Sequence, residues 1–371
     1  MFTHLVRLLS SSPRLGSIRR FTTAPEAFYY GAIHSYFLPQ AVFTAIDLSL
    51  ADHLKGSMSV ADLATATGTV ADRTDRLMKY LAVHGVFERV SPGVYRHNAV
   101  SEMLKDENVR GPRNAGLELT RVVLAKAMEG WTSAIKGETD IPFQKSFGNL
   151  TLSEFLGLPA NEPTKKVFDL AMLSLTNKNL ESVMAAYKWQ QHLNAKVVDV
   201  GAGLGHFLAA LLQKHPTFQG VVFDLPEAAA NAQNFWKQSH SALLPRVHFE
   251  TGSFFEQIPS GGDLYVIKSI LHDLKDEDCV RVLTKVAAAM RQTQQSEPSK
   301  RPSVLIIDKV YDFPPRMGSI ADYDMVMFSL FAAKERSWEE FEKLFVATGL
   351  KIVERLDTSS DLSILRCELS S

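Results

Sequence analysis

Short apolar runs and longer amphipathic stretches alternate through the second half of the chain. Five of the apolar runs are predicted strands, and they begin at Val197, Val221, Val247, Leu264 and Val304. Strands that alternate with helices indicate a parallel sheet covered on both faces. Two further runs, at 351–356 and 362–369, flank a polar turn and predict a closing antiparallel hairpin. The pattern therefore predicts an α/β fold with a Rossmann-like, seven-stranded sheet.

The first half of the chain predicts a smaller domain rich in helices. Residues 37–50 repeat apolar side chains at helical spacing, and Ser59 and Thr69 are predicted N-caps of two further helices. Gly85 is predicted to end the second of these helices. Strand signals at 87–90 and 94–97 then flank a turn that contains proline and glycine. Helix, helix and hairpin in this order predict a winged-helix domain.

The changes of pattern divide the chain into four predicted parts: 1–24, 25–105, a helical connector at 106–165, and the sheet domain at 166–371. The first part has arginines and serines but no acidic residue before Glu26, a composition typical of mitochondrial transit peptides. We expect import into mitochondria. The alternative is a disordered basic tail on a cytoplasmic protein.

Composition narrows the classes of function. A chain of 371 residues that is 46% hydrophobic can bury two large cores, and a net charge of −1 argues against bulk attraction to nucleic acid or an anionic membrane. Winged helices often bind DNA, so a transcriptional regulator is one alternative. The helix that would read the DNA carries Asp72 and Asp75 among its basic residues, which makes it a poor phosphate clamp. The two cysteines, Cys279 and Cys367, provide neither a disulfide framework nor a zinc cluster.

A glycine loop follows the strand that begins at Val197. Asp199 lies at the end of this strand, and alternating glycines come next at Gly201, Gly203 and Gly205. Glycine allows a sharp turn and the close approach of a ligand to the start of the following helix. A dinucleotide fingerprint would need another glycine at His206. The next strand ends in Asp224, where an acid can accept hydrogen bonds from ribose hydroxyls.

Several short motifs occur in the order and spacing of one enzyme family. They are the acidic glycine loop, Asp224-Leu225-Pro226, Gly252-Ser253-Phe254, the run from Lys268 to His272-Asp273, and Lys334-Glu335-Arg336. From about Tyr29 to the C-terminus the chain resembles the small-molecule O-methyltransferases that use S-adenosylmethionine. This family includes the plant caffeate and flavonoid enzymes and acetylserotonin O-methyltransferase.

The resemblance implies a cofactor site and a catalytic base. The residues expected to bind S-adenosylmethionine are Asp199, Gly201, Gly203, Gly205, Asp224, Leu225, Ser253, Phe254 and Lys268. His272 corresponds to the general base, held between Asp308 and Glu335, and no metal is required. A neutral imidazole can take the proton of a phenol while the cationic cofactor favours the developing phenolate.

The resemblance also implies a small aromatic hydroxyl compound as methyl acceptor and a homodimer formed through the N-terminal domain. The expected substrate contacts are Met172, Thr176, Met325, Phe328 and Phe331, although methionine and phenylalanine at such positions also fill ordinary cores. Nitrogen and carboxyl acceptors remain open. Some relatives of this fold use the cofactor for decarboxylation or hydroxylation, and the intact base with both supporting acids argues against that alternative.

Five residues depart from the pattern of the resembled family. Ala202 replaces the second glycine of the loop, and Ser253 replaces an acid expected to contact the adenine amino group. Leu274 stands where the family has tryptophan after His-Asp, and Ala332-Ala333 replace two glycines. These changes affect cofactor contacts and the shape of the acceptor pocket, but they leave the base in place.

Overall fold

The computed structural model describes residues 31–32, 34–105 and 115–370, apart from the side chains of residue 115 and residues 173–178. The predicted transit segment 1–24 lies outside this part, so mitochondrial import stays a prediction. The chain forms two compact units. One comprises the residues up to Ala125 together with Leu156–Ser174, and the other comprises Lys126–Phe155 and Leu175–Ser371. The predicted connector at 106–165 is therefore divided between the two units.

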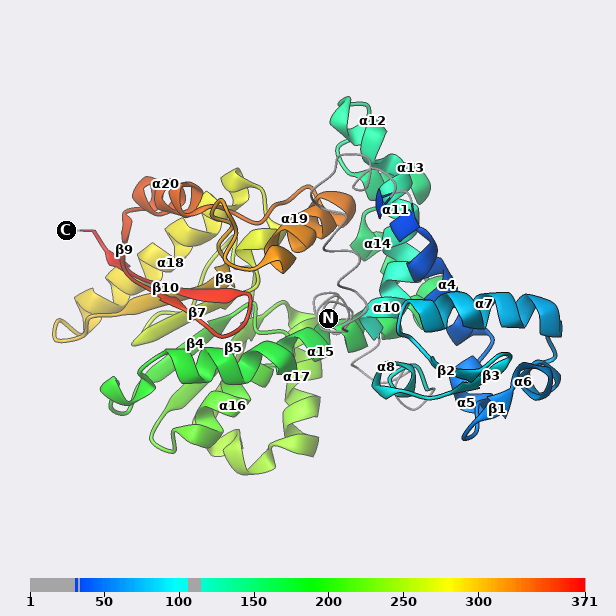
Figure 1. Ribbon diagram of the computed structural model, residues 1–371. Coiled ribbons are helices and arrows are strands. Elements are labelled where there is room, and N and C mark those ends of the chain that lie inside the picture. Colours follow the sequence, from blue (N-terminus) through cyan, green and yellow to red (C-terminus); the bar gives the residue numbers. More distant parts are fainter. Residues whose placement is uncertain (1–30, 33, 106–114, 371) are drawn as a thin grey trace. The chain divides into compact units, whose positions relative to one another are not determined.

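The larger unit is built on a seven-stranded sheet with the order β6-β5-β4-β7-β8-β10-β9 (Figure 1). Its strands are β4 (Lys196–Val200), β5 (Gln219–Asp224), β6 (Val247–Thr251), β7 (Leu264–Lys268), β8 (Ser303–Lys309), β9 (Leu350–Asp357) and β10 (Leu362–Leu369). The first five pair in parallel, whereas β10 is antiparallel to both β8 and β9. The predicted parallel sheet and its closing hairpin are both confirmed.

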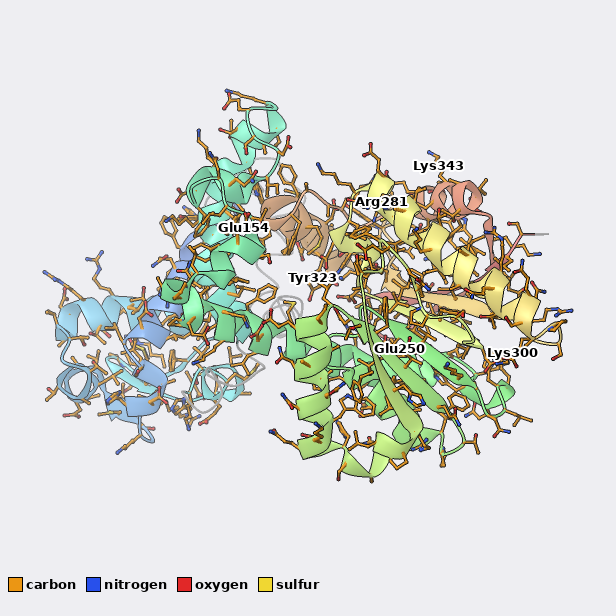
Figure 2. The ribbon with its side chains drawn as sticks, turned by 180° about the vertical axis from the view of Figure 1, so that it is seen from behind. Glu154, Glu250, Arg281, Lys300, Tyr323 and Lys343 are labelled. Carbon is orange, nitrogen blue, oxygen red and sulfur yellow. The ribbon has the colours of Figure 1, made fainter. Side chains whose placement is uncertain are left out.

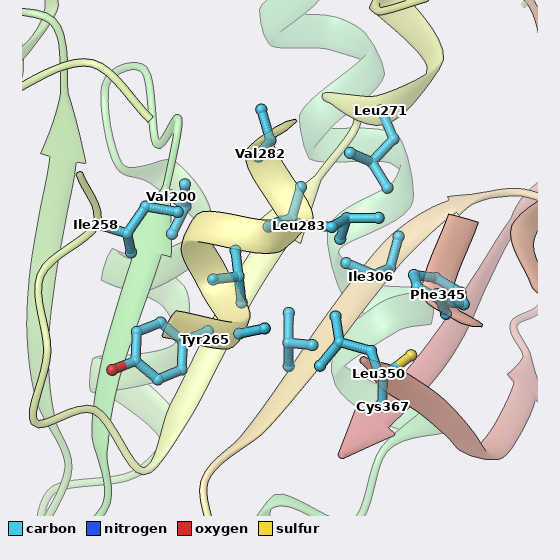
Figure 3. Packing of buried hydrophobic residues seen from close by; sticks show 14 of the residues in the cluster. Val200, Ile258, Tyr265, Leu271, Val282, Leu283, Ile306, Phe345, Leu350 and Cys367 are labelled. Atoms are coloured by element: carbon cyan, nitrogen blue, oxygen red, sulfur yellow. The ribbon is translucent and has the colours of Figure 1, made fainter. Parts of the chain in front are cut away.

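Two apolar clusters cover the faces of this sheet. Figure 1 shows α16 (His206–Lys214) and α17 (Pro226–Ser239) on one face, and α18 (Asp276–Ser296) and α20 (Trp338–Thr348) on the other. Leu283, Ile306 and Phe345 from α18, β8 and α20 pack in one cluster and are almost fully buried (Figure 3). All seven residues of β8 are buried, as a central strand covered on both faces requires.

Six further helices belong wholly or in part to the larger unit, and the longest of them, α15, is divided between the two units. They are α11 (Ala125–Ala127), α12 (Trp131–Ile135), α13 (Pro142–Ser146), α14 (Leu152–Gly157), α15 (Glu162–Ala186) and α19 (Gly318–Leu330). Single turns of 3-10 helix join several of them. No helix within the described ranges combines the length and the apolar character that crossing a bilayer requires.

The smaller unit contains the predicted succession of helices and a hairpin. Its helices are α4 (Phe37–Asp47), α5 (Leu50–His53), α6 (Val60–Thr67), α7 (Ala71–Val83), α8 (Ala99–Glu102) and α10 (Ala115–Leu119), the last continued by a π-helical turn. A three-stranded sheet has the order β1-β3-β2, with β1 at Met58–Ser59, β2 at Glu88–Ser91 and β3 at Val94–Arg96. Leu63, Met78 and Tyr95 are fully buried in its core.

Two local predictions in this unit are wrong, and two are confirmed. The helix predicted over 37–50 stops at Asp47 because Ser49 adopts a left-handed φ of 49°. The N-cap of α7 is Val70, so Thr69 is not the capping residue. The Thr69 hydroxyl instead forms a hydrogen bond of 2.7 Å with the Thr74 hydroxyl. The Ser59 side chain caps α6 by accepting from the Asp62 N–H. Gly85 adopts a φ of 77° just after α7 ends, as predicted.

Candidate active site

The glycine loop lies at the carboxyl end of β4. Gly201, Gly203 and Gly205 have φ values of 69°, 57° and 73°, which side chains other than glycine rarely adopt. A Cβ on Gly201 would lie 2.8 Å from Cδ1 of Ile270 and 3.6 Å from Cε1 of Phe254. The glycine loop therefore packs closely against the turn after β7 and against Phe254. Ala202 is outside the residues with positive φ, so its replacement of glycine adds no backbone strain.

Two acids lie beside this loop with different environments. Oδ2 of Asp224 accepts a hydrogen bond of 2.7 Å from the Gly203 N–H, and Oδ1 accepts one of 2.7 Å from the Leu225 N–H. Asp199 is buried, and its Oδ2 has no hydrogen-bond partner among the described residues. Burial raises the pKa of Asp199 to about 7, although Lys268 opposes the rise. An unsatisfied buried carboxyl is costly, so this atom fits a donor from a bound ligand.

The remaining residues predicted for the cofactor surround the same edge of the sheet. Phe254 is half-buried, and its ring stands edge-on to Phe255 with the ring centres 4.8 Å apart. The Ser253 hydroxyl accepts a bond of 3.3 Å from the Phe255 N–H, whereas Leu225 is 55% exposed. Lys268 ends β7, and burial lowers its pKa while Asp199 and Asp308 oppose that change. Glycine loop, acids and apolar side chains together suit a cationic, nucleoside-containing cofactor.

His272 lies in a single 3-10 turn, Leu271–Asp273, which follows β7. Its Nδ1 lies 3.1 Å from Oε1 of Glu335 and 3.4 Å from Oδ1 of Asp308. Its backbone N–H donates to Oδ2 of Asp308 at 3.2 Å. Ser269, before this turn, has a left-handed φ of 55°, a strained conformation that often occurs at functional sites. The structure thus brings together the three predicted catalytic residues, from the turn after β7, from β8 and from the segment before α20.

The electrostatics of this cluster favour a charged imidazole. Burial alone would lower the pKa of His272, but Asp308 and Glu335 raise it to about 9. Burial raises the pKa of Asp308, with His272 opposing. Burial acts in the same direction on Glu335, but His272 and Lys309 lower its pKa overall. Glu335 is therefore the carboxylate that stays charged beside the imidazole.

Two cations support this cluster, and the sequence reasoning assigned a role to neither. Lys309 follows Asp308, and its Nζ lies 3.0 Å from Oε1 of Glu335. Arg336 follows Glu335, is 1% exposed, and donates hydrogen bonds to the carbonyl oxygens on either side of His272. The signal available in the sequence was that each supporting acid is followed directly by a basic residue.

One ring nitrogen of His272 and one carboxylate oxygen each of Asp308 and Glu335 lie within 4.8 Å of one another, as the ligand atoms of a metal ion would. We do not assign them as metal ligands, because two N–H donors already contact the same oxygen of Glu335. An imidazole oriented by a carboxylate is the arrangement of a general base.

The predicted substrate residues divide into three groups. Phe328 and Phe331 line a cavity of about 380 Å³, together with the departures noted above, Leu274 and Ala332-Ala333. Met325 lies on the same helix, α19, but does not line this cavity. Met172 belongs to the other compact unit, and the Thr176 side chain lies outside the described residues. The cavity has an apolar wall of aromatic and small side chains, and Asp140, Lys275, Asp276, Lys334 and Arg336 supply its charged groups.

Comparison with known proteins identifies two matching family models. The O-methyltransferase domain matches residues 129–351, and the O-methyltransferase dimerisation domain matches residues 30–106. A 2,7-dihydroxy-5-methyl-1-naphthoate 7-O-methyltransferase of Streptomyces carzinostaticus is 31% identical over 85% of this chain and 90% of its own. A mitomycin biosynthesis 6-O-methyltransferase of Streptomyces lavendulae is 30% identical over 85% and 86%, respectively.

A solved structure is similar over most of the chain. It is an O-methyltransferase from neocarzinostatin biosynthesis, in complex with S-adenosylmethionine and 2-hydroxy-5-methyl naphthoic acid. The identity is 30% and the TM-score 0.70, over 89% of this chain and 95% of that one.

Proposed function

The chain belongs to the S-adenosylmethionine-dependent O-methyltransferases, and we propose that it methylates a hydroxyl group of a small aromatic molecule with His272 as general base. The observation that carries this proposal is the 3.1 Å contact between Nδ1 of His272 and Glu335, on a turn that packs against the glycine loop through Ile270. A base and a cofactor loop held side by side are what an in-line methyl transfer needs.

The bound cofactor supplies an electrophilic methyl group on a positively charged sulfur. Asp224 and the glycine loop are proposed to hold its ribose, and the free oxygen of Asp199 is available to accept a hydrogen bond from its amino group. Phe254 and Leu225 present apolar surface next to these acids, as a planar adenine requires.

His272 takes up the proton released by the acceptor. When Nδ1–H of the neutral ring donates to Glu335, Nε2 carries the lone pair that accepts a proton, and Nε2 lies 3.5 Å from Oδ1 of Asp273. As the new bond between the acceptor oxygen and the methyl carbon forms, the bond from that carbon to sulfur breaks. The hydroxyl proton moves to Nε2, and Glu335 stabilises the resulting imidazolium.

An aromatic acceptor is supported by the side chains near this base. Phe328 and Phe331 line one cavity with Leu274, which follows His272 by two residues. Phenyl rings favour offset or edge-on packing against a planar guest. The naphthoate named for one of the relatives is a molecule of this kind.

Two further proposals concern the assembly and the destination of the protein. The match to a dimerisation domain over residues 30–106 supports a homodimer, which sedimentation or light scattering of the purified chain would test. The composition of residues 1–24 supports mitochondrial import, which localisation of a tagged full-length chain and of a chain lacking this segment would test.

The experiment for the proposed reaction uses labelled cofactor and a panel of phenols, indoles and carboxylic acids. With an accepted substrate, His272→Ala should lower the rate of methyl transfer by about two to four decades and leave binding of S-adenosylhomocysteine unchanged. His248→Ala is the control, because His248 is an exposed histidine on β6 of the same sheet. Unaltered turnover in His272→Ala would show that another residue is the base.

A further inference from the structure

Lys309, the last residue of β8, places a buried cation in the active site. It is 6% exposed, and its Nζ lies 3.0 Å from Oε1 of Glu335 and 4.2 Å from the centre of the Tyr323 ring. A buried ammonium is costly unless it is paired, so these contacts hold it in place. Lys309 is therefore a built part of the cluster and not a surface lysine that reaches in.

The ammonium and the catalytic imidazole contact the same atom. Oε1 of Glu335 lies 3.1 Å from Nδ1 of His272 and 3.0 Å from Nζ of Lys309, while Oε2 is buried without a hydrogen-bond partner among the described residues. One carboxylate oxygen therefore serves two positively charged donors. A second cation at this oxygen weakens the attraction that keeps a proton on the imidazole.

We propose that Lys309 is a positioning residue for methyl transfer, which holds Glu335 against His272 and lowers the proton affinity of the imidazole by sharing that carboxylate. With Lys309 present, the pKa of His272 is about 9, so a small neutral fraction of the imidazole is available as a base near neutral pH. Without a cation at Glu335 the imidazole would hold its proton more tightly, and that neutral fraction would be smaller.

The other groups around His272 act in known directions. Asp308, Glu335 and Asp273 raise its pKa, whereas burial and Lys309 lower it. Glu335 and Asp308 raise the pKa of Lys309 against the effect of burial, so its charge persists while His272 titrates. Burial raises the pKa of Tyr323, which keeps that phenol neutral beneath the ammonium. Lys268 interacts with Asp308, and Asp324 accepts a hydrogen bond from the Glu335 N–H, so both groups act on the acids that flank the imidazole.

The test compares charge removal with charge retention at one position. Lys309→Gln keeps an N–H donor for Glu335 and removes the charge, whereas Lys309→Arg keeps the charge. Lys300→Gln is the control, because Lys300 pairs with Asp263 and Glu297 before β8 begins, well away from Tyr323 in Figure 2. The His272 imidazole is titrated by NMR in the full chain with labelled histidine, and the rate of methyl transfer is measured against pH.

Lys309→Gln should shift the His272 titration to higher pH by about one unit, with Lys309→Arg and Lys300→Gln close to the unaltered protein. The rate at pH 7.5 should then fall about tenfold and recover at higher pH. A uniform loss of rate without a shifted titration would mean that Lys309 only supports the fold, and it would overturn the proposal. If Lys309→Gln does not fold, the NMR signal of a labelled Lys309 Nζ is followed against pH in the unaltered protein. This signal should change with the same midpoint as the titration of His272. Different midpoints would also overturn the proposal.

The role of Lys309 in catalysis rests on the proposed function, but the electrostatic coupling between Lys309 and His272 does not. If the NMR titration shifts while His272→Ala retains full turnover, the proposed base is wrong and the coupling stands. If His272→Ala loses turnover and the titration does not shift, the base is right and Lys309 has no such role.

Discussion

Nη2 of Arg336 donates a hydrogen bond of 2.6 Å to the carbonyl oxygen of Leu274. The same guanidinium donates from Nη1 to the carbonyl of Leu271, and its Nε lies 2.9 Å from Oδ1 of Asp276. Because Leu271 and Leu274 bracket His272, Arg336 fixes the short turn that presents the imidazole. Glu335 orients the imidazole ring of His272, and Arg336, the next residue after Glu335, anchors the backbone of the turn that carries His272.

Replacing Arg336 should damage both stability and catalysis. Arg336→Met removes the guanidinium donors from two carbonyl oxygens and takes this buried partner away from Asp276, so we expect the free energy of unfolding to fall by about 3 kcal/mol. Arg336→Lys should be intermediate, because one ammonium cannot reproduce the planar fork that reaches two carbonyls. Urea denaturation and turnover of the folded fraction measure the two effects. Lys343→Met is the control, because Lys343 is an exposed cation on α20, and an Arg336→Met protein as stable as this control would refute the anchoring role.

The raised pKa of His272 predicts how this residue contributes to stability as pH changes. Its pKa is about 9 in the folded protein against an ordinary value near 6.5, so the folded state binds the proton more tightly. The resulting stabilisation is fully present below about pH 6.5 and is lost as pH rises through 9. Between these limits the stability difference between the unaltered protein and His272→Gln should shrink by about 3 kcal/mol at most. Urea denaturation at several pH values gives this difference, and one that grows with pH would contradict the assignment.

Most of the fold follows from local sequence patterns. Short, apolar, β-branched runs such as the one ending at Val200 favour buried strands, and their alternation with helices implies the parallel sheet. The N-cap at Ser59 could also be predicted from the sequence, because a serine before an apolar stretch accepts a hydrogen bond from the first N–H groups of a helix. The break at Ser49 was not readable, since a left-handed serine between apolar residues carries no composition signal.

The site was predictable only in part. The cofactor loop can be recognised from its own residues, but Asp308 and Glu335 were assigned through family resemblance, because they lie far from His272 in sequence. The roles of Lys309 and Arg336 depend on contacts between segments that meet only in the folded chain. No periodicity reveals that a lysine at the end of an apolar strand shares a carboxylate with a histidine.

The charge of the cofactor should tune the base. S-adenosylmethionine carries a positive sulfur that S-adenosylhomocysteine lacks, and a nearby positive charge disfavours the imidazolium. The pKa of His272 should therefore lie below its value of about 9 when S-adenosylmethionine is bound, and closer to 9 with S-adenosylhomocysteine. NMR titration of both complexes in the absence of acceptor measures this difference, with His272→Gln identifying the signal. Equal pKa values would place the sulfur too far from the imidazole for the proposed transfer.

Alanine substitutions at two glycines of the cofactor loop distinguish the effect of backbone strain from the effect of a steric clash. Both Gly201 and Gly203 have positive φ, so alanine at either position costs about 1 kcal/mol of strain. Only at Gly201 would the new Cβ meet a neighbour, 2.8 Å from Cδ1 of Ile270, whereas nothing lies within 4 Å at Gly203. Gly201→Ala should therefore lower the melting temperature and weaken binding of S-adenosylhomocysteine more than Gly203→Ala does.

A second substitution tests the cause of that difference. Valine lacks the Cδ1 atom, so Ile270→Val in the Gly201→Ala background should restore part of the lost affinity, while the same change beside Gly203→Ala should restore none. Calorimetric titration of the unaltered protein, the three single variants and the two double variants with S-adenosylhomocysteine measures the coupling. Additive effects at Gly201 and Ile270 would show that the loop and the turn carrying His272 do not constrain each other, because a shared steric contact requires the two changes to interact.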